Sequence, residues 1–157
     1  MVRKIDLLLA EYGDSHENRL NKIIHWICVP VIVWTVVALI WSIPFPWKIG
    51  SGIISLNWAV VALVLAQIYY FSLSRRLGLG LLLYNLGMLW LTSIIEETSP
   101  WPLWQLALVV FIIAWIGQFI GHIYEGKRPS FFKDVQFLLI GPAWLMSFIF
   151  RKIGYRW

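Results

Sequence analysis

The chain has 157 residues, of which 60% are hydrophobic and only 13% are charged, and its net charge is +5. A soluble domain of this length would carry more charged residues, so the composition predicts a single integral membrane domain over residues 1–157. The basic residues flank apolar stretches, a pattern typical of membrane orientation, and this distribution excludes a nucleic-acid-binding groove.

An amphipathic helix is predicted at the amino-terminal end, over residues 3–12. Ile5, Leu8, Leu9 and Tyr12 recur at the i, i+3, i+4, i+7 spacing of one helix face, with charged residues between them. We expect this helix to lie on the membrane surface.

Four apolar stretches that follow are long enough to cross a hydrocarbon core of about 30 Å, which needs roughly 20 residues. They are Ile23–Ile43, Ile53–Leu73, Leu77–Ile95 and Leu103–Tyr124. A fifth, Val135–Phe150, is shorter and contains Gly141-Pro142. Proline removes a helix hydrogen bond, so a broken, re-entrant or tilted segment sheltered by protein is expected there. The predicted fold class is therefore all-α, a membrane bundle of four transmembrane helices with a re-entrant or tilted fifth segment.

The lysines and arginines predict the orientation of this bundle. If the fifth segment does not cross, all of the 13 basic residues except Lys48 lie on one side of the membrane. The positive-inside rule then places both termini in the cytoplasm. The expected location is the inner membrane of a bacterium, or the endoplasmic reticulum membrane of a eukaryote.

A first polar motif lies where the first span begins. Asn21 and His25 are four residues apart, so they share one face of a helix. His16 precedes His25 by nine residues, which is about 900° of helix rotation and half a turn out of phase. Both imidazoles can face one ion only if the chain bends near residues 17–20 or if His16 lies in a loop. Asp14 and Glu17 form the pattern of a capping box, which predicts a helix start there.

A second polar motif ends the fourth span. Gln118, His122 and Glu125 fall at i, i+4 and i+7, so they form one polar stripe on an apolar helix. Polar residues within membrane helices usually face the bundle interior or a water-filled cavity. Lys127 and Arg128 follow, where they could meet an anionic headgroup or a carboxylate.

The three histidines are the only ones in the chain, and all lie at span ends on the same predicted side. This grouping favours a metal or acid–base site. Imidazole with carboxylate or amide oxygen suits Fe(II), Zn(II) or Mn(II), and haem held by two histidines is a further candidate. The alternative is a non-enzymatic lipid-binding or structural membrane protein in which each histidine only makes hydrogen bonds. A transporter is disfavoured because the middle spans contain few ionisable residues.

The two motifs together resemble the Mpo1-like family of membrane proteins, whose characterised yeast member is an iron-dependent 2-hydroxy fatty acid dioxygenase. The resemblance lies in His-x4-Asn-x3-His-x4-Pro, ending at Pro30, and in Gln-Phe-x-Gly-His-x2-Glu-x-(basic)-Arg-Pro, ending at Pro129. The later Gly141-Pro142 agrees as well. Ser130 departs from the family pattern, where alanine is expected.

The resemblance implies Fe(II) as cofactor, O2 as oxidant and a long-chain 2-hydroxy fatty acid as substrate, which would lose one carbon by alpha-oxidation. It implies His16, His25 and His122 as iron ligands and Glu125 as a ligand or a supporting group. Asn21 would orient a histidine or bind the substrate hydroxyl. Lys127 and Arg128, with Gln118 nearby, would hold the substrate carboxylate.

Overall fold

The computed structural model describes residues 3–47, 50, 56–126 and 131–155, without the side chains of residues 131–135. Within these residues the chain is α-helical and contains no strand, which confirms the all-α prediction. The helices, in chain order, are α1 (Lys4–Asp14), α2 (Arg19–Trp41), α3 (Trp58–Leu73), α4 (Arg75–Thr98), α5 (Leu103–Glu125) and α6 (Phe131–Lys152).

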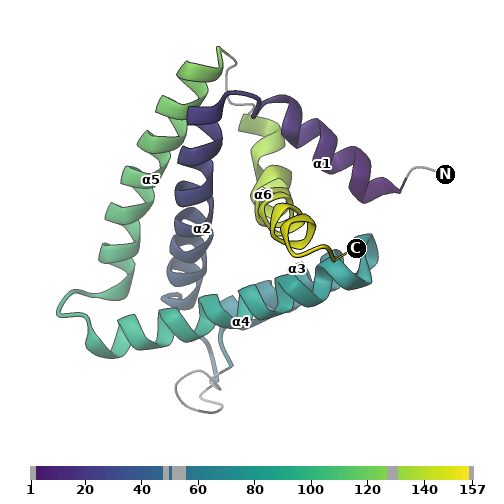
Figure 1. Ribbon diagram of the computed structural model, residues 1–157. Coiled ribbons are helices and arrows are strands. Elements are labelled where there is room, and N and C mark those ends of the chain that lie inside the picture. Colours follow the sequence, from purple (N-terminus) through teal and green to yellow (C-terminus); the bar gives the residue numbers. More distant parts are fainter. Residues whose placement is uncertain (1–2, 48–49, 51–55, 127–130, 156–157) are drawn as a thin grey trace.

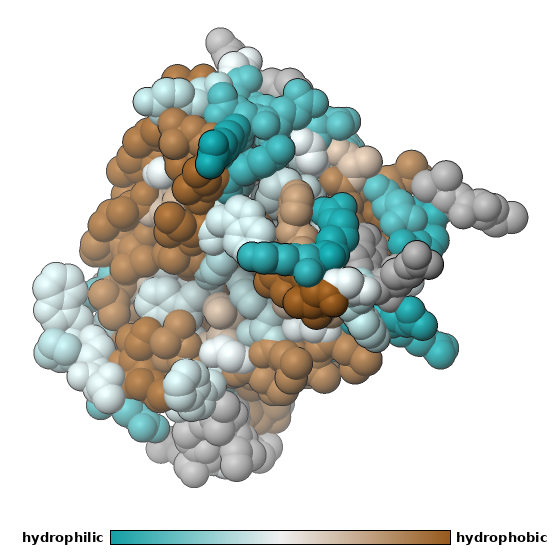
Figure 2. Space-filling view, viewed as in Figure 1, coloured by the Kyte–Doolittle hydropathy of each residue, from teal (hydrophilic) through white to brown (hydrophobic). Residues whose placement is uncertain are grey.

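Three of the described helices, α2, α4 and α5, are long and apolar enough to cross a membrane, and α3 is a shorter apolar helix of 16 residues. The number of crossings therefore stays a prediction. Large apolar side chains cover the outward face of α5, among them Ile113, Ile116 and Ile123. Figure 2 shows hydrophobic residues over that flank and hydrophilic residues at the end where α2 begins. An apolar flank with one polar end is the surface expected of a membrane protein.

Helices α2 and α5 lie side by side along their length (Figure 1). Two glycines of α5 allow this close approach. A Cβ atom on Gly117 would lie 2.8 Å from Cys28 Sγ, and one on Gly121 would lie 2.5 Å from Asn21 Oδ1. Small residues at such contacts are the usual means by which membrane helices approach each other closely.

The hairpin of α3 and α4 does not continue this pair as a parallel bundle, because α4 runs crosswise below α2 and α5 (Figure 1). Gln67 of α3 joins the two helices of the hairpin by donating to the Gly78 carbonyl at 2.8 Å and accepting from Asn85 Nδ2 at 3.1 Å. Gly80 allows α6 to approach α4, since a Cβ atom there would lie 2.6 Å from Phe150 Cζ. The predicted bundle is thus a splayed arrangement around a tight α2–α5 pair.

Helix α6 is continuous through Gly141 and Pro142, so the predicted break in this segment is absent. Neighbouring helices can sustain a helix through a proline by supporting the freed backbone groups. Gly141 is the point of closest support, because a Cβ atom there would lie 3.1 Å from both Tyr12 Oη and Val29 Cγ1. The placement of α6 relative to the membrane stays a prediction.

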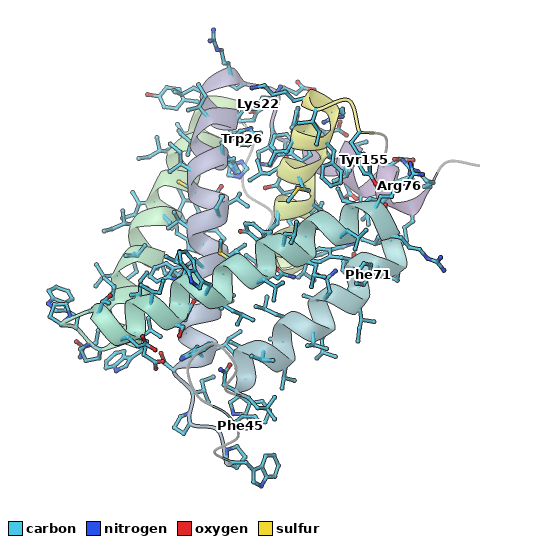
Figure 3. The ribbon with its side chains drawn as sticks, turned by 60° about the horizontal axis from the view of Figure 1, so that its bottom comes forward. Lys22, Trp26, Phe45, Phe71, Arg76 and Tyr155 are labelled. Atoms are coloured by element: carbon cyan, nitrogen blue, oxygen red, sulfur yellow. The ribbon has the colours of Figure 1, made fainter. Side chains whose placement is uncertain are left out.

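The predicted amphipathic helix is present as α1, and its apolar face is confirmed. Ile5, Leu8, Leu9 and Tyr12 are buried in one cluster with Trp144 of α6. The apolar face therefore packs on protein, where burial removes it from solvent as a lipid contact would. The start of α4 lies beside Tyr155, near the carboxyl-terminal end of the chain. The Arg76 guanidinium is 5.8 Å from the Tyr155 ring (Figure 3).

Candidate metal centre

His16 lies in the turn between α1 and α2, because α2 begins later than the sequence pattern suggested. The predicted helix start at Asp14 and Glu17 is wrong: Asn18 is the N-cap of α2, and its side-chain oxygen accepts from the Leu20 N–H at 2.8 Å. Because α2 begins at Arg19, His16 lies outside the helix, and helical periodicity does not fix the direction of its side chain. One straight helix could not bring His16 and His25 together, but the loop position of His16 does.

The His16 imidazole is held by its neighbours in α1. It stacks on the Tyr12 ring, with 4.3 Å between ring centroids and 9° between planes. Its Nδ1 lies 2.6 Å from the Tyr12 carbonyl oxygen. Because a carbonyl can only accept, Nδ1 carries the proton and Nε2 keeps its lone pair. That Nε2 atom is buried and has no hydrogen-bond partner among the residues that the structure describes. Buried polar atoms are nearly always satisfied, so this nitrogen is available for a ligand.

His25 lies on the inward face of α2 and is held in the same way. Its Nδ1 is 2.9 Å from the carbonyl oxygen of Asn21, one turn earlier, so Nδ1 is again the donor. Hydrogen bonding of one ring nitrogen fixes which nitrogen can bind a metal. The His25 side chain is 1% exposed. Both rings are therefore oriented and dehydrated; Nε2 of His16 has no partner among the described residues, whereas the His25 ring also interacts with the Gln118 side chain.

His122 of α5 completes the cluster. The ring centroids are 4.1 Å apart for His16 and His25, 5.1 Å for His25 and His122, and 5.5 Å for His16 and His122. One ligand atom of each lies within 4.8 Å of the others. Nitrogens that bind one tetrahedral ion at 2.0–2.1 Å lie roughly 3.4 Å apart. A small inward shift of the rings would therefore bring all three nitrogens to one ion.

The electrostatics of the loop histidine also suit a ligand. Burial lowers the pKa of His16 to about 4; the hydrogen bond to the Tyr12 carbonyl opposes this shift, and the nearby His122 adds to it. The imidazole is therefore neutral at pH 7. A neutral imidazole is the form that binds metals.

Glu125 lies at the end of α5 and holds the start of α2. Its carboxylate accepts from the Glu17 N–H at 2.8 Å, the Asn18 N–H at 3.0 Å and Asn21 Nδ2 at 2.9 Å. Asn21 also donates to the Ser15 carbonyl at 3.1 Å. An anion at a helix N-terminus is favoured by the unpaired N–H groups and the helix dipole. With both oxygens engaged in this way, the geometry favours a supporting role for Glu125.

Gln118 is buried on α5, one turn before His122, and its side chain interacts with the His25 imidazole. Gly126 ends α5 in the left-handed conformation, at φ 69°, which a glycine adopts without strain. Lys127 and Arg128, the predicted carboxylate-binding pair, lie outside the described residues.

Two aromatic residues that the sequence analysis did not assign to the site lie against His16. Tyr12 belongs to the predicted apolar face of the first helix. Its position four residues before His16 is the feature of the sequence that could have placed it at the site. Trp144 of α6 lies 5.5 Å from the His16 ring and is 4% exposed. Its contact with the site depends on the docking of α6, which the sequence pattern did not reveal.

Two comparisons with known proteins identify relatives of this chain. The family model described as 2-hydroxy-palmitic acid dioxygenase Mpo1-like matches residues 2–153. The Saccharomyces cerevisiae protein named 2-hydroxy-palmitic acid dioxygenase MPO1 is 30% identical over 151 residues, which cover 94% of this chain and 80% of that protein. No solved structure matches the chain.

Proposed function

Since this chain belongs to the Mpo1-like family, we propose that it is an Fe(II)-dependent dioxygenase that shortens 2-hydroxy fatty acids by one carbon with O2. The observation that carries the proposal is the cluster of three imidazoles, which come from a loop, from α2 and from α5. A relative named as a dioxygenase supports an oxidative reaction. The overall change, from a 2-hydroxy acid and O2 to the shortened acid, CO2 and water, balances in atoms and electrons.

His16, His25 and His122 would hold the iron through one nitrogen each. Three protein ligands leave coordination positions open, and bound Fe(II) supplies the redox chemistry with O2 there. The carbonyls of Tyr12 and Asn21 orient two of the ligands, and such outer partners usually contribute strongly to metal affinity. The aromatic rings beside His16 exclude water from that side of the site.

The substrate would bind with its polar end at the histidines. A 2-hydroxy acid offers a hydroxyl and a carboxylate on adjacent carbons, and both can occupy open positions on one ion. We retain Lys127 and Arg128 as the predicted partners of the carboxylate and Gln118 and Asn21 as polar groups near the hydroxyl. The cytoplasmic face is the expected location of the site, because the basic residues gather there under the positive-inside rule.

The non-enzymatic alternative is less well supported. A histidine that serves only to hold helices together satisfies its buried nitrogens with partners in the protein. His16 Nε2 is buried and has no such partner within the described part of the chain. Its neighbours fix the ring and leave that nitrogen to something else, as a ligand role requires.

Metal analysis of the anaerobically purified protein tests the proposal, with an affinity tag that contains no histidine. The expected result is about one iron per chain, lost in the double variant His25→Ala/His122→Ala and retained in Cys28→Ala. Wild-type protein should consume O2 with 2-hydroxy palmitate and release the acid one carbon shorter, identified by mass spectrometry. Stoichiometric zinc without O2 consumption, or no metal after Fe(II) reconstitution, would refute the proposal.

A further inference from the structure

An apolar cavity of about 160 Å³, partly open to the surroundings, lies between α2, α3, α4 and α6. Its walls include Val33, Val36 and Ile40 of α2, Ala62 and Ala66 of α3, and Leu139 of α6. Two polar residues that touch it are engaged with other groups. Tyr70 donates to the Leu139 carbonyl at 2.9 Å, and Asn85 donates to Gln67 at 3.1 Å. The cavity therefore offers an occupant almost only apolar contacts.

The cavity and the histidine cluster adjoin neighbouring faces of α2, and Val36 is the lining residue of α2 closest in helix phase to His25. Val36 follows His25 by eleven residues, which is about 20° from it in helix phase and roughly 16 Å along the axis. Ile40 lies about 22 Å from His25 by the same measure. Helix α6 also links the two places, because its Leu139 lines the cavity and its Trp144 lies beside His16.

The layer between the two places is apolar as well. Val29 and Ile140 are buried in one hydrophobic cluster there, and Gly141 brings α6 against Val29. An alkyl chain that passes this layer displaces mainly apolar side chains. Such a displacement costs far less than the desolvation of a polar group.

We infer that this cavity is the binding site for the end of the substrate's alkyl tail, and that it sets the preferred chain length. The inference rests on the proposed function for the position of the polar end. A C–C bond of about 1.5 Å advances an extended chain by roughly 1.3 Å, so a 16-carbon acid spans about 19 Å. A chain that starts at the histidines then ends between Val36 and Ile40. A cavity of about 150 Å³ admits a benzene ring, so about six tail carbons fill this one.

The test measures the affinity of the full-length protein for 2-hydroxy acids of 8 to 18 carbons by ligand-induced thermal stabilisation in detergent, with O2 uptake measured in parallel. The variant Ala62→Phe places a six-carbon ring in the cavity. Val64→Phe adds an aromatic ring to the same helix at a residue that is 52% exposed, and it serves as the matched control. Ala62→Leu is a smaller filling for use if the phenylalanine variant does not fold.

In the wild type, affinity should rise about fourfold with each added carbon, the effect of burying one methylene, until it levels off near 16 carbons. In Ala62→Phe the rise should end four to six carbons earlier, and the 16-carbon acid should bind at least tenfold more weakly. Acids of 8 to 10 carbons should bind both proteins equally. With Ala62→Leu the rise should end two to three carbons earlier.

Identical chain-length profiles in the wild type and the filled variant would overturn the inference, even if turnover confirms the proposed function. A filled variant that loses affinity equally for all chain lengths would also overturn it, because the cavity would then not be the place of the tail's end. If no acid is turned over but the affinity profile shortens in Ala62→Phe, the proposed reaction fails and the tail site stands.

Discussion

Glu125→Gln is the substitution that best separates a metal ligand from a group that holds the fold. The carboxylate accepts hydrogen bonds from two backbone N–H groups at the start of α2 and from the Asn21 side chain. Glutamine keeps one acceptor but turns an NH2 group toward these donors. Hydrogen bonds to a charged group contribute about 1.5–3 kcal/mol each, and the favourable charge at a helix N-terminus contributes about 0.3–1 kcal/mol.

Because Glu125 is only partly buried and glutamine retains one bond, we expect a net loss of about 2 kcal/mol. For a chain of this size that loss lowers Tm by about 4–8 °C. The assay compares the Tm of metal-free wild type, Glu125→Gln and Glu17→Gln in detergent, together with iron content after reconstitution. Glu17→Gln removes a negative charge from the same turn but keeps the backbone N–H, so its Tm should stay within about 1 °C of wild type. Loss of iron in Glu125→Gln with an unchanged metal-free Tm would refute the supporting role and make Glu125 a ligand.

Three further predictions follow from the helix contacts and the cluster. Gly121→Ala should cost about 1–3 kcal/mol of stability because its Cβ would lie 2.5 Å from Asn21 Oδ1. A Cβ at Gly87 would meet no described atom within 4 Å, so Gly87→Ala should stabilise α4 by about 0.5–1 kcal/mol. Equal Tm values for the two variants would contradict this interpretation. Chelation of the metal should lower stability by about 2.7 kcal/mol relative to protein with iron at 100 times its Kd, and the triple histidine variant should show no such effect. In a Cys28→Ala background, a membrane-impermeant thiol reagent added outside cells should modify Ser99→Cys but not Ser15→Cys, and the reverse result would invert the predicted topology.

The positions of the helices were largely predictable because apolar length alone determines which segments can enter a membrane. The sharing of one helix face by Asn21 and His25, and by Gln118 and His122, was also predictable, since it depends only on helical periodicity. The packing between helices depends on contacts that no local pattern encodes. The crosswise course of α4 is one such feature, and the continuous α6 with its buried Pro142 is another.

The helix start of α2 shows most clearly why the rest was not predictable. Asp14 and Asn18 are both good N-cap residues, and the sequence around Asp14 has the better capping pattern. The structure uses Asn18, whose N–H and that of Glu17 are bound by the carboxylate of Glu125, more than 100 residues further along the chain. A long-range contact thus selects between two local alternatives. That choice places His16 in a loop, and the approach of His16 to the other two histidines depends on it.

The lack of a partner for His16 Nε2 among the described residues has an energetic consequence for the amino-terminal region. A buried polar atom without a partner costs about 1–3 kcal/mol, and rotation of the ring toward solvent would avoid this cost. The ring cannot rotate freely, because Tyr12 stacks on it, the Tyr12 carbonyl holds Nδ1 and Trp144 lies against it. The apolar burial of α1 on α6 therefore offsets the cost and keeps the nitrogen aimed at the other two histidines. A metal bound at the three histidines, as proposed, would pair with this nitrogen and remove the cost, and this is the physical argument for the proposed metal site.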